Sequence, residues 1–424
     1  MLKRNTISFS FPQNEKRLMK NKMLNWLRSF SIFSYLDNNE YKHEPCRYEL
    51  LVGCNPLQVI HSLNVPDNDW WLGHINYDFK NAIEPRLQSH HADNIGFEDV
   101  LFYQPETVVY IKFNTAELII ETFKEDAQSI LNEILGMPDA VDDEQIAISN
   151  PKWKYHFQKE NYISTVEQIR QHIEEGDCYE LNLCTEAFAG QVMMDPVFRF
   201  YKLNSLNPSP YAALYRNDDK WLLCASPERF SYKEKNTVIS QPIKGTARTS
   251  KDPVEDEQLK EKLFNDKKER AENVMIVDLV RNDLAKSCEV GTVRVSELFG
   301  VYSFPQVHQL ISTISGKIKE GLSNETIIKN AFPMGSMTGA PKVMVMQLIE
   351  RYERSKRGLY SGTIGYVNPD GDFDFNVVIR SLFYNAQTHY LSYQTGGAIT
   401  YESNPISEWK EVRLKANAME QIFL

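Results

Sequence analysis

The chain has 424 residues, of which 42% are hydrophobic and 25% charged, a composition that excludes disordered and collagen-like proteins. It carries 47 basic and 57 acidic residues, a formal net charge of −10, which argues against a nucleic-acid backbone as the main partner. A small anionic substrate is not excluded, because a local pocket can be basic on an acidic protein.

An amphipathic helix is predicted near the N-terminus, over residues 23–36 (MLNWLRSFSIFSYL). We expect this helix to pack on the core, with a position on a membrane surface as the alternative. No stretch approaches the roughly 18 apolar residues that span a bilayer, and no signal peptide precedes the helix. The sequence therefore predicts a cytoplasmic protein with no membrane partner.

The chain divides at a polar, proline-bounded stretch, residues 136–151, which we predict to be a linker. An amphipathic helix over about 159–175 follows and ends at Gly176. The remaining pattern is a set of antiparallel strands (177–246), a long helix (253–288), a strand meander (359–400) and a closing helix (407–423). Strand clusters separated by helices predict an α+β fold with large antiparallel sheets.

The six cysteines are scattered along the chain and form no C-x-x-C pair. That usage is typical of reduced thiols in the cytosol. The nine histidines show no metal-binding spacing, so a zinc site is not expected.

Two pairs of glutamates stand three residues apart on predicted helices, Glu269 with Glu272 and Glu408 with Glu411. This spacing puts each pair on one helix face, and two opposed faces could hold Mg²⁺ through oxygen ligands. From spacing alone, solvated helix faces with partners such as Glu411–Lys415 are the commoner cause of such a pattern.

Lys244 lies at the end of a predicted strand, before Gly245. A lysine in a partly desolvated pocket can lose its proton and act as a nucleophile, although a lysine at a strand end is more often simply exposed. Glu228 comes sixteen residues earlier. If the two strands pair, Glu228 could act as a general acid in the same cavity; an ordinary edge-strand glutamate is the alternative.

Two loops rich in small residues, 331–342 and 395–398, could bind an anion through backbone N–H groups. Four basic residues stand in or near these loops in the sequence: Lys342, Arg380, Arg413 and Lys415. A basic cluster on an acidic protein indicates a small polyanion, such as a dicarboxylate, as the substrate.

Taken in order, these segments resemble the chorismate-utilising enzymes, the family of anthranilate synthase component I. The matching segments are GDCYELNL (176–183), ASPERF (225–230), QPIKGTARTS (241–250), ERAENVMIVDLVRNDLAK (269–286), FPQVHQLIS (304–312), AFPMGSMTGAPKVMVMQLIE (331–350), SGTIGYVNPDGDFDFNVVIRSL (361–382), QTGGAIT (394–400) and EWKEVRLKA (408–416). Residues 1–150 match more loosely, chiefly through WWLGHINYDFKNAIEPR (70–86).

The resemblance implies a fold of two large antiparallel β-sheets packed as a sandwich with helices on the outside. It also implies two regions. Residues 1–150 would form an N-terminal region that is part of the same sandwich, and residues 151–424 the chorismate-binding catalytic region.

One position separates members of this family. Anthranilate synthases usually read P-I-A-G-T where this chain has Lys244 in PIKGT, and lysine there resembles aminodeoxychorismate synthase component I, of the para-aminobenzoate branch of folate synthesis. Anthranilate synthase component I, with Lys244 incidental, is the alternative. Isochorismate and salicylate synthases carry a lysine near the position of Glu180, so hydration of chorismate is not expected here, and the role of Glu180 stays open.

The resemblance also implies roles for single residues. Lys244 would add covalently at C2 of chorismate while Glu228 protonates the departing C4 hydroxyl, and ammonia would then attack C4 and expel the lysine. Glu272 and Glu411 would bind Mg²⁺, with Glu269 and Glu408 as outer ligands through water. The positions expected around the substrate carboxylates are Ser336, Tyr366, Arg380, Gly396, Gly397 and Lys415.

His308 matches a histidine beside the substrate ring, but a buried structural histidine is the stronger interpretation here. No cysteine stands in a glutaminase-type G-x-C-x-G turn. The resemblance therefore implies a separate glutamine amidotransferase subunit or free ammonia, and a separate aminodeoxychorismate lyase downstream. The sequence before residue 60 lacks the L-L-E-S motif of feedback-sensitive relatives, so inhibition by tryptophan is not expected.

Overall fold

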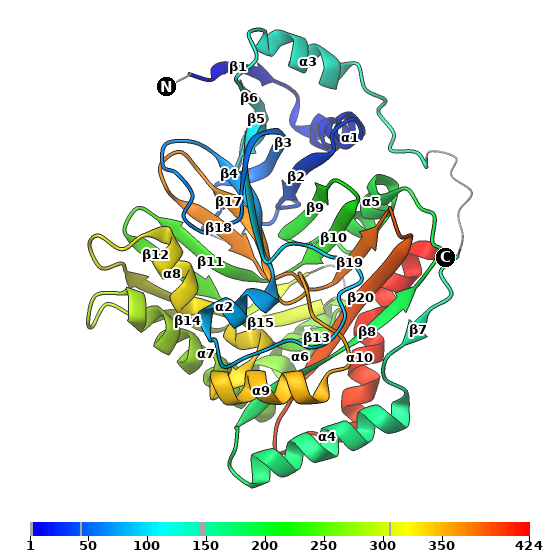
Figure 1. Ribbon diagram of the computed structural model, residues 1–424, viewed down its shortest axis with the longest axis vertical. Helices are drawn as coiled ribbons and strands as arrows, with labels where there is room; N and C mark the ends of the chain where they lie inside the picture. Colours follow the sequence, from blue (N-terminus) through cyan, green and yellow to red (C-terminus); the bar gives the residue numbers. More distant parts are fainter. Residues whose placement is uncertain (1–2, 43–44, 144–149, 305–306) are drawn as a thin grey trace.

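A computed structural model describes residues 3–42, 45–143, 150–304 and 307–424 (Figure 1). Residues 144–149 of the predicted linker lie outside the described residues, as do residues 305–306 of the FPQVHQLIS segment. In Figure 1, α1 and α3 lie at one end of the long axis and α4, α9 and α10 towards the other.

The described residues contain twenty strands. In chain order they are β1 (Asn5–Ser10), β2 (Ile32–Asp37), β3 (Tyr48–Ile60), β4 (Trp71–Ile75), β5 (Val100–Lys112), β6 (Glu117–Thr122), β7 (Lys154–Tyr155), β8 (Glu180–Ala189), β9 (Tyr211–Asn217), β10 (Lys220–Ser226), β11 (Arg229–Glu234), β12 (Thr237–Gln241), β13 (Ile243–Arg248), β14 (Arg294–Ser303), β15 (Val307–Lys317), β16 (Gly339–Ala340), β17 (Thr363–Val367), β18 (Phe373–Asn376), β19 (Ser381–Asn385) and β20 (Tyr390–Ile399).

The strands form one hydrogen-bonded antiparallel sheet. One half runs β8–β20–β19–β10–β9–β2–β3–β5, with β7 and β16 beside β8. The other half runs β4–β17–β18–β11–β12–β15, with β13 and β14 completing it at β15.

The α+β class and the large antiparallel sheet are confirmed, but the strand pairing does not separate into the two sheets that the sequence analysis expects. The 13-residue strand β5 joins the halves. It pairs with β3 along most of its length, with β4 through residues 100–103, and with β6 through residues 107–111. Strands from both sides of residue 150 also pair directly, β2 with β9 and β4 with β17.

Helices connect and cover the strands. They are α1 (Lys16–Leu27), α2 (Lys80–Ile83), α3 (Ala127–Leu135), α4 (Lys159–Glu174), α5 (Pro196–Leu206), α6 (Pro253–Asn265), α7 (Lys267–Ser287), α8 (Asn324–Ala331), α9 (Lys342–Tyr352) and α10 (Pro405–Glu420), with 3₁₀ turns η1 (Gln13–Glu15), η2 (Tyr77–Phe79), η3 (Gly335–Met337) and η4 (Gln421–Phe423).

The predicted helix over residues 253–288 is two helices, because Asp266 between them has extended backbone angles (φ −67°, ψ 118°). Its side chain accepts a hydrogen bond from the backbone N–H of Glu269 and so caps α7. The first turns of α7, which carry Glu269 and Glu272, are fixed in this way.

The prediction of a helix over residues 23–36 is wrong in its second half. Helix α1 ends at Leu27, and β2 starts at Ile32, between β3 and β9. Within β2, Phe33 and Tyr35 are fully buried in a hydrophobic core together with Leu27 of α1. The apolar residues therefore serve core packing, as the sequence analysis expects, but partly as a central strand.

Successive side chains along the central strands pack alternately into two separate hydrophobic cores. On β10, Leu222 belongs to one hydrophobic cluster and Leu223 to the other, and on β9 Tyr215 and Leu214 divide in the same way. Successive strand residues point to opposite faces, so the sheet here is buried on both sides. Such a sheet gives the strand ends that carry the site a rigid base.

Candidate active site

The side chain of Lys244 on β13 is buried in an ion pair. Its Nζ lies 2.6 Å from Oε1 of Glu180 on β8, and the two side chains are 11% and 1% exposed. Burial alone would lower the pKa of Lys244, but the carboxylates of Glu180, Glu272 and Glu228 outweigh burial and raise it. Lys244 is therefore an ammonium group at rest and needs a proton acceptor before it can act as a nucleophile.

Glu228 is buried beside Ser336 of η3. Burial raises the pKa of Glu228 to about 7, against hydrogen bonds from the Ser336 side chain and the Ile243 backbone and the charge of Lys244, which lower it. A carboxyl group with a pKa near 7 can hold a proton and release it at neutral pH. The structure thus brings Glu228, Lys244 and Ser336 together.

Glu269 and Glu272 occupy the first turns of α7, as the spacing predicts. Burial raises the pKa of Glu269, and raises that of Glu272 to about 7. Lys244 and Lys268 oppose the shift of Glu272 through their positive charges. The position of both glutamates at a helix N-terminus favours their charged forms, because the helix dipole is positive there.

Glu408 and Glu411 occupy the corresponding place on α10, where Asn404 caps the helix. Glu408 is 4% exposed, and burial raises its pKa. Lys415, with Nζ 2.7 Å from Glu411 Oε1, holds the pKa of Glu411 below its usual value. The Nζ of Lys415 also donates to the backbone oxygen of Gly396 at 2.8 Å.

The side chain of Lys268 contacts glutamates near the N-termini of both α7 and α10. Its Nζ lies 3.6 Å from Glu272 and 3.9 Å from Glu408, and the charges of Glu269 and Glu411 also act on it. The charges of all four predicted metal ligands therefore act on one ammonium group. We refer to Glu269, Glu272, Glu408 and Glu411 as the glutamate cluster.

The glutamate cluster fits a divalent cation with oxygen ligands. Its donors are carboxylates, which Mg²⁺ prefers. Oε1 of Glu272 is buried without a hydrogen-bond partner and has the Lys268 ammonium 3.6 Å away, so this oxygen could also serve a bound cation. No three of the four carboxylates bring oxygen atoms within 4.8 Å of one another. As placed, at most two of these carboxylates could touch one Mg²⁺ directly, and the others would reach it through water.

The two glycines of the TGGA segment (395–398) have different steric roles. A Cβ on Gly396 would lie 2.5 Å from Sγ of Cys184, so glycine there permits the close pairing of β20 with β8. A Cβ on Gly397 would lie 3.4 Å from Oε2 of Glu408 and 3.9 Å from Oε1 of Glu411. Gly397 therefore leaves space in front of the glutamate cluster.

Arg380, just before β19, is partly buried, and burial lowers its pKa although the charge of Glu411 opposes the shift. Among the described residues, no hydrogen bond or ion pair engages its guanidinium group. It lines a cavity of about 60 Å³ together with Gln309, whose Oε1 is also buried without a partner. An unpaired guanidinium is a suitable partner for a substrate carboxylate.

His308 is fully buried, and protein groups occupy both ring nitrogens. Nδ1 lies 2.9 Å from the Ser303 hydroxyl and Nε2 lies 2.9 Å from Asp256. These contacts agree with the interpretation of His308 as a buried structural histidine.

Tyr366 is not placed with the other predicted residues. Its hydroxyl accepts a hydrogen bond from Arg47 at 3.5 Å, and its ring packs on Tyr48 and Trp70. The correction follows from its strand: β17 pairs with β4, so Tyr366 enters the aromatic core of the N-terminal region. Tyr360, which the sequence analysis does not select, instead acts on the charge of Arg380.

Lys268 and Glu180 are two further residues of the site to which the sequence alone assigns no role. Lys268 could have been found, because Lys268 and Glu272 are an i, i+4 pair on a helix. The pairing of Glu180 with Lys244 carries no signal in the sequence, because it joins strands 64 positions apart.

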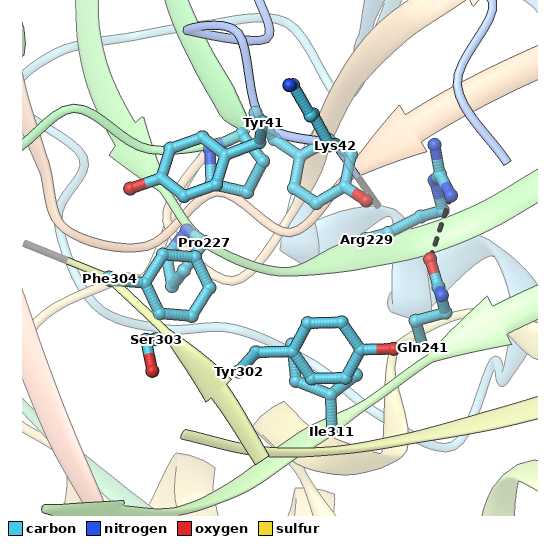
Figure 2. Close-up of a pocket in the computed structure, with 11 residues that line it drawn as sticks. Tyr41, Lys42, Pro227, Arg229, Gln241, Tyr302, Ser303, Phe304 and Ile311 are labelled. Atoms are coloured by element: carbon cyan, nitrogen blue, oxygen red, sulfur yellow. Dashed lines mark hydrogen bonds between the residues drawn. The ribbon is translucent and has the colours of Figure 1, made fainter. Parts of the chain in front are cut away.

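A cavity between β14, β11 and the Tyr41 segment does not contain the predicted site residues. It measures about 180 Å³, and Figure 2 shows the rings of Tyr41, Tyr302 and Phe304 around it. Its arginine, Arg229, is already satisfied by two bonds to Asp374 and one to Gln241. We therefore do not assign the anionic substrate to this cavity.

The remaining sequence expectations concern thiols, metals and membranes. All six cysteines are free, as predicted. His172, Glu175 and Asp177 form a compact group, but both nitrogens of His172 already contact Asp177 and Tyr352, so we assign no metal there. Within the described ranges, no helix is both long and apolar enough to cross a membrane.

The chain is similar in sequence to proteins of one known family. A family model described as chorismate binding enzyme matches residues 30–421. The chain is 38% identical to aminodeoxychorismate synthase component 1 of Klebsiella aerogenes over 62% of its own length and 58% of that protein. It is 32% identical to the Bacillus subtilis protein of the same name over 82% of its own length and 76% of that protein.

Among solved structures, anthranilate synthase component I from Streptococcus pneumoniae is similar, with a TM-score of 0.77 and 26% identity over 90% of this chain and 93% of that one. The chain spans only 30–58% of the length of three curated relatives that it matches. The family match nevertheless covers most of the chain, including every residue of the glutamate cluster together with Lys244 and Glu228. The chain belongs to the chorismate-binding enzyme family.

Proposed function

We propose that the protein is an aminodeoxychorismate synthase of the component I type, which converts chorismate and ammonia to 4-amino-4-deoxychorismate. One observation carries this proposal. Lys244 is the cation at the centre of the site and lies within the charge field of Glu180, Glu228 and Glu272. A lysine that merely replaced the alanine of an anthranilate synthase would have no need of such a buried position.

The proposed chemistry uses groups that are already adjacent. The Lys244 amine attacks C2 of chorismate, and Glu228 gives its proton to the C4 hydroxyl, which leaves as water. Ammonia then attacks C4, and the bond from C2 to Lys244 breaks. The pKa of Glu228, about 7, is suited to this proton transfer at neutral pH.

Mg²⁺ would be held by Glu272 and Glu411, with Glu269 and Glu408 behind water. When bound, it would neutralise carboxylate charge on the substrate. The positive groups beside the glutamate cluster, Arg380 and Lys415, would orient the substrate carboxylates, with Ser336, Gly396 and Gly397 close by. His308 would support the wall of the site rather than take part in the chemistry.

Ammonia would come from a glutamine amidotransferase subunit, since the two bacterial relatives named above are called component 1. A separate aminodeoxychorismate lyase would then complete para-aminobenzoate for folate synthesis. We propose the cytoplasm as the site of this reaction, and residues 1–150 and 151–424 as the N-terminal and catalytic regions of the enzyme.

Anthranilate synthase component I is the second candidate, favoured by the structural similarity to the Streptococcus pneumoniae protein. One incubation separates the two functions: protein, chorismate, Mg²⁺ and ammonium. We expect a product that yields para-aminobenzoate only after a lyase is added. Direct appearance of fluorescent anthranilate would reject our proposal.

A Lys244→Ala variant completes the test. We expect it to lose ammonia-dependent activity and to form no covalent adduct with chorismate. Full activity of this variant would show that Lys244 is not the nucleophile.

A further inference from the structure

We propose that Glu180 is the proton acceptor that frees the Lys244 amine for attack on the substrate, an inference that rests on the function proposed above. Glu180 Oε1 accepts a hydrogen bond from Lys244 Nζ at 2.6 Å. Among the described residues, Glu180 is the one carboxylate within 4.0 Å of that nitrogen.

The other nearby carboxylates have different partners or roles. Glu228 is hydrogen-bonded to Ser336 and, as the acid, must hold a proton when the lysine attacks. It cannot take a second proton at the same moment. Glu272 faces Lys268 and belongs to the glutamate cluster.

Glu180 also has a free site for hydrogen bonding. Its Oε2 is buried and has no hydrogen-bond partner. A buried oxygen without a partner is unfavourable, so such a group in a native structure calls for an explanation, of which a catalytic role is one. A carboxylate with one unpaired oxygen can receive a proton on one atom and still accept a hydrogen bond on the other.

The backbone holds this carboxylate in place. Glu180 begins β8 and pairs with Ala340 of β16. Gly339 has φ +140°, and a Cβ there would lie only 2.0 Å from the backbone oxygen of Glu180. The close pairing of these two strands restricts a shift of β8 at Glu180.

The proton balance closes over the reaction. The Lys244 ammonium gives one proton to the Glu180 carboxylate and becomes a neutral amine. Its electron pair forms the bond to C2, the ring double bond shifts, and the C4–O bond breaks with the proton of Glu228, releasing water. When ammonia adds at C4, the C2–N bond breaks, and Glu180 returns its proton to the departing amine of Lys244. The ammonium group formed at C4 gives one proton to the Glu228 carboxylate, which restores the acid.

The test measures the first half of this sequence. The full-length protein is mixed with chorismate and Mg²⁺ without ammonium, quenched at set times, and the Lys244 adduct is quantified by mass spectrometry. Glu180→Gln keeps the size and the hydrogen bond but cannot take a proton. We expect it to form the adduct about 100-fold more slowly or worse, with KM for chorismate changed by less than about threefold.

Two variants complete the comparison. Glu180→Asp keeps a carboxylate, and we expect adduct formation faster than in Glu180→Gln. Glu175→Gln removes the same charge from an exposed glutamate at the C-terminal end of α4, and we expect it to match the wild type. Thermal unfolding of every variant checks that each one is folded.

The outcomes separate the two proposals. If the wild type makes aminodeoxychorismate but Glu180→Gln forms the adduct at the wild-type rate or faster, only the role of Glu180 is rejected. A Glu180→Asp variant no faster than Glu180→Gln would reject it as well. If the wild type makes no aminodeoxychorismate, the proposed function fails and this inference fails with it.

Discussion

The ammonium group of Lys268, at the start of α7, lies 3.9 Å from the carboxylate of Glu408, at the start of α10. These residues are far apart in the sequence, yet the contact brings two helix N-termini together, each carrying a pair of glutamates. A basic side chain thus balances part of the charge of the glutamate cluster.

Removing that basic group should increase the dependence on a divalent cation. In Lys268→Met, four carboxylates lose their shared positive neighbour, so we expect a lower melting temperature in EDTA and a larger rise on adding Mg²⁺, by about 1–3 °C more than in the wild type. Differential scanning calorimetry measures both values. Lys317→Met, which removes an exposed lysine from an ion pair with Glu289, is the matched control. An equal Mg²⁺ response in all three proteins would contradict the placement of the cation.

The pKa of Glu228 predicts how turnover depends on pH. Glu228 must be protonated to act as an acid, so kcat should fall as the pH rises through about 7, where the carboxyl group ionises. Glu228→Gln should reduce kcat by about 10²–10⁴-fold and remove this limb of the profile. A steady-state profile from pH 5.5 to 9 checks both points, and a wild-type profile flat above pH 7 would argue against Glu228 as the acid.

The Glu228 carboxyl group should also make the free energy of unfolding depend on pH. Its pKa is higher in the folded protein, about 7, than the ordinary 4.5, so the folded state binds the proton more tightly. The contribution is fully present below about pH 4.5 and is lost as the pH rises through 7. Between pH 5 and pH 8, the free energy of unfolding of Glu228→Gln should therefore rise relative to that of the wild type by up to about 3 kcal/mol. Urea unfolding in EDTA at the two pH values measures the difference.

The ion pair of Lys244 and Glu180 predicts strong coupling in stability. Lys244→Met alone leaves the buried Glu180 carboxylate without its partner, and we expect a loss of about 3–5 kcal/mol in the free energy of unfolding. The double variant Lys244→Met with Glu180→Gln should recover much of that loss, because the buried charge is removed as well. A double-mutant cycle from urea unfolding gives the coupling energy. Simple additivity would show that the two groups do not interact.

Arg380 should contribute to chorismate binding and contribute little to folding stability. Because its guanidinium has no partner among the described residues, Arg380→Met should leave the melting temperature unchanged or slightly higher. Loss of a charged hydrogen bond to the substrate is worth about 1.5–3 kcal/mol, so KM for chorismate should rise about 10-fold or more. Tyr366→Phe is the comparison, with kcat/KM expected within about twofold of the wild type, because its hydroxyl contacts Arg47.

The parts of the fold that could be predicted from the sequence are those with a local signal. The glutamate pairs lie on helices as their spacing indicates, and α4 ends just before Gly176, which has φ +86°. Residues 32–36 were assigned to the wrong element, because a short apolar run of aromatic and serine residues is ambiguous between a helix and a strand.

Long-range pairing could not be predicted in this way. The neighbours of Tyr366 depend on β17 lying against β4, and the partner of Lys244 depends on where β8 passes β13. No periodicity or motif encodes which strand a given strand will meet. The family resemblance identifies the site residues. The ion pair between Lys244 and Glu180 is evident only in the three-dimensional structure.

The joining of both halves of the sheet through β5 has a consequence for how the chain is made. Ile75 of β4 pairs with Thr363 of β17, which leaves the ribosome about 290 residues later. At about 5–20 residues per second, that delay is roughly 15–60 s. During this interval β4, whose side chains are buried in the folded protein, can pair with β5 on one edge but has no neighbour on the other. Synthesis in the cell would therefore favour early chaperone contact with the first 150 residues.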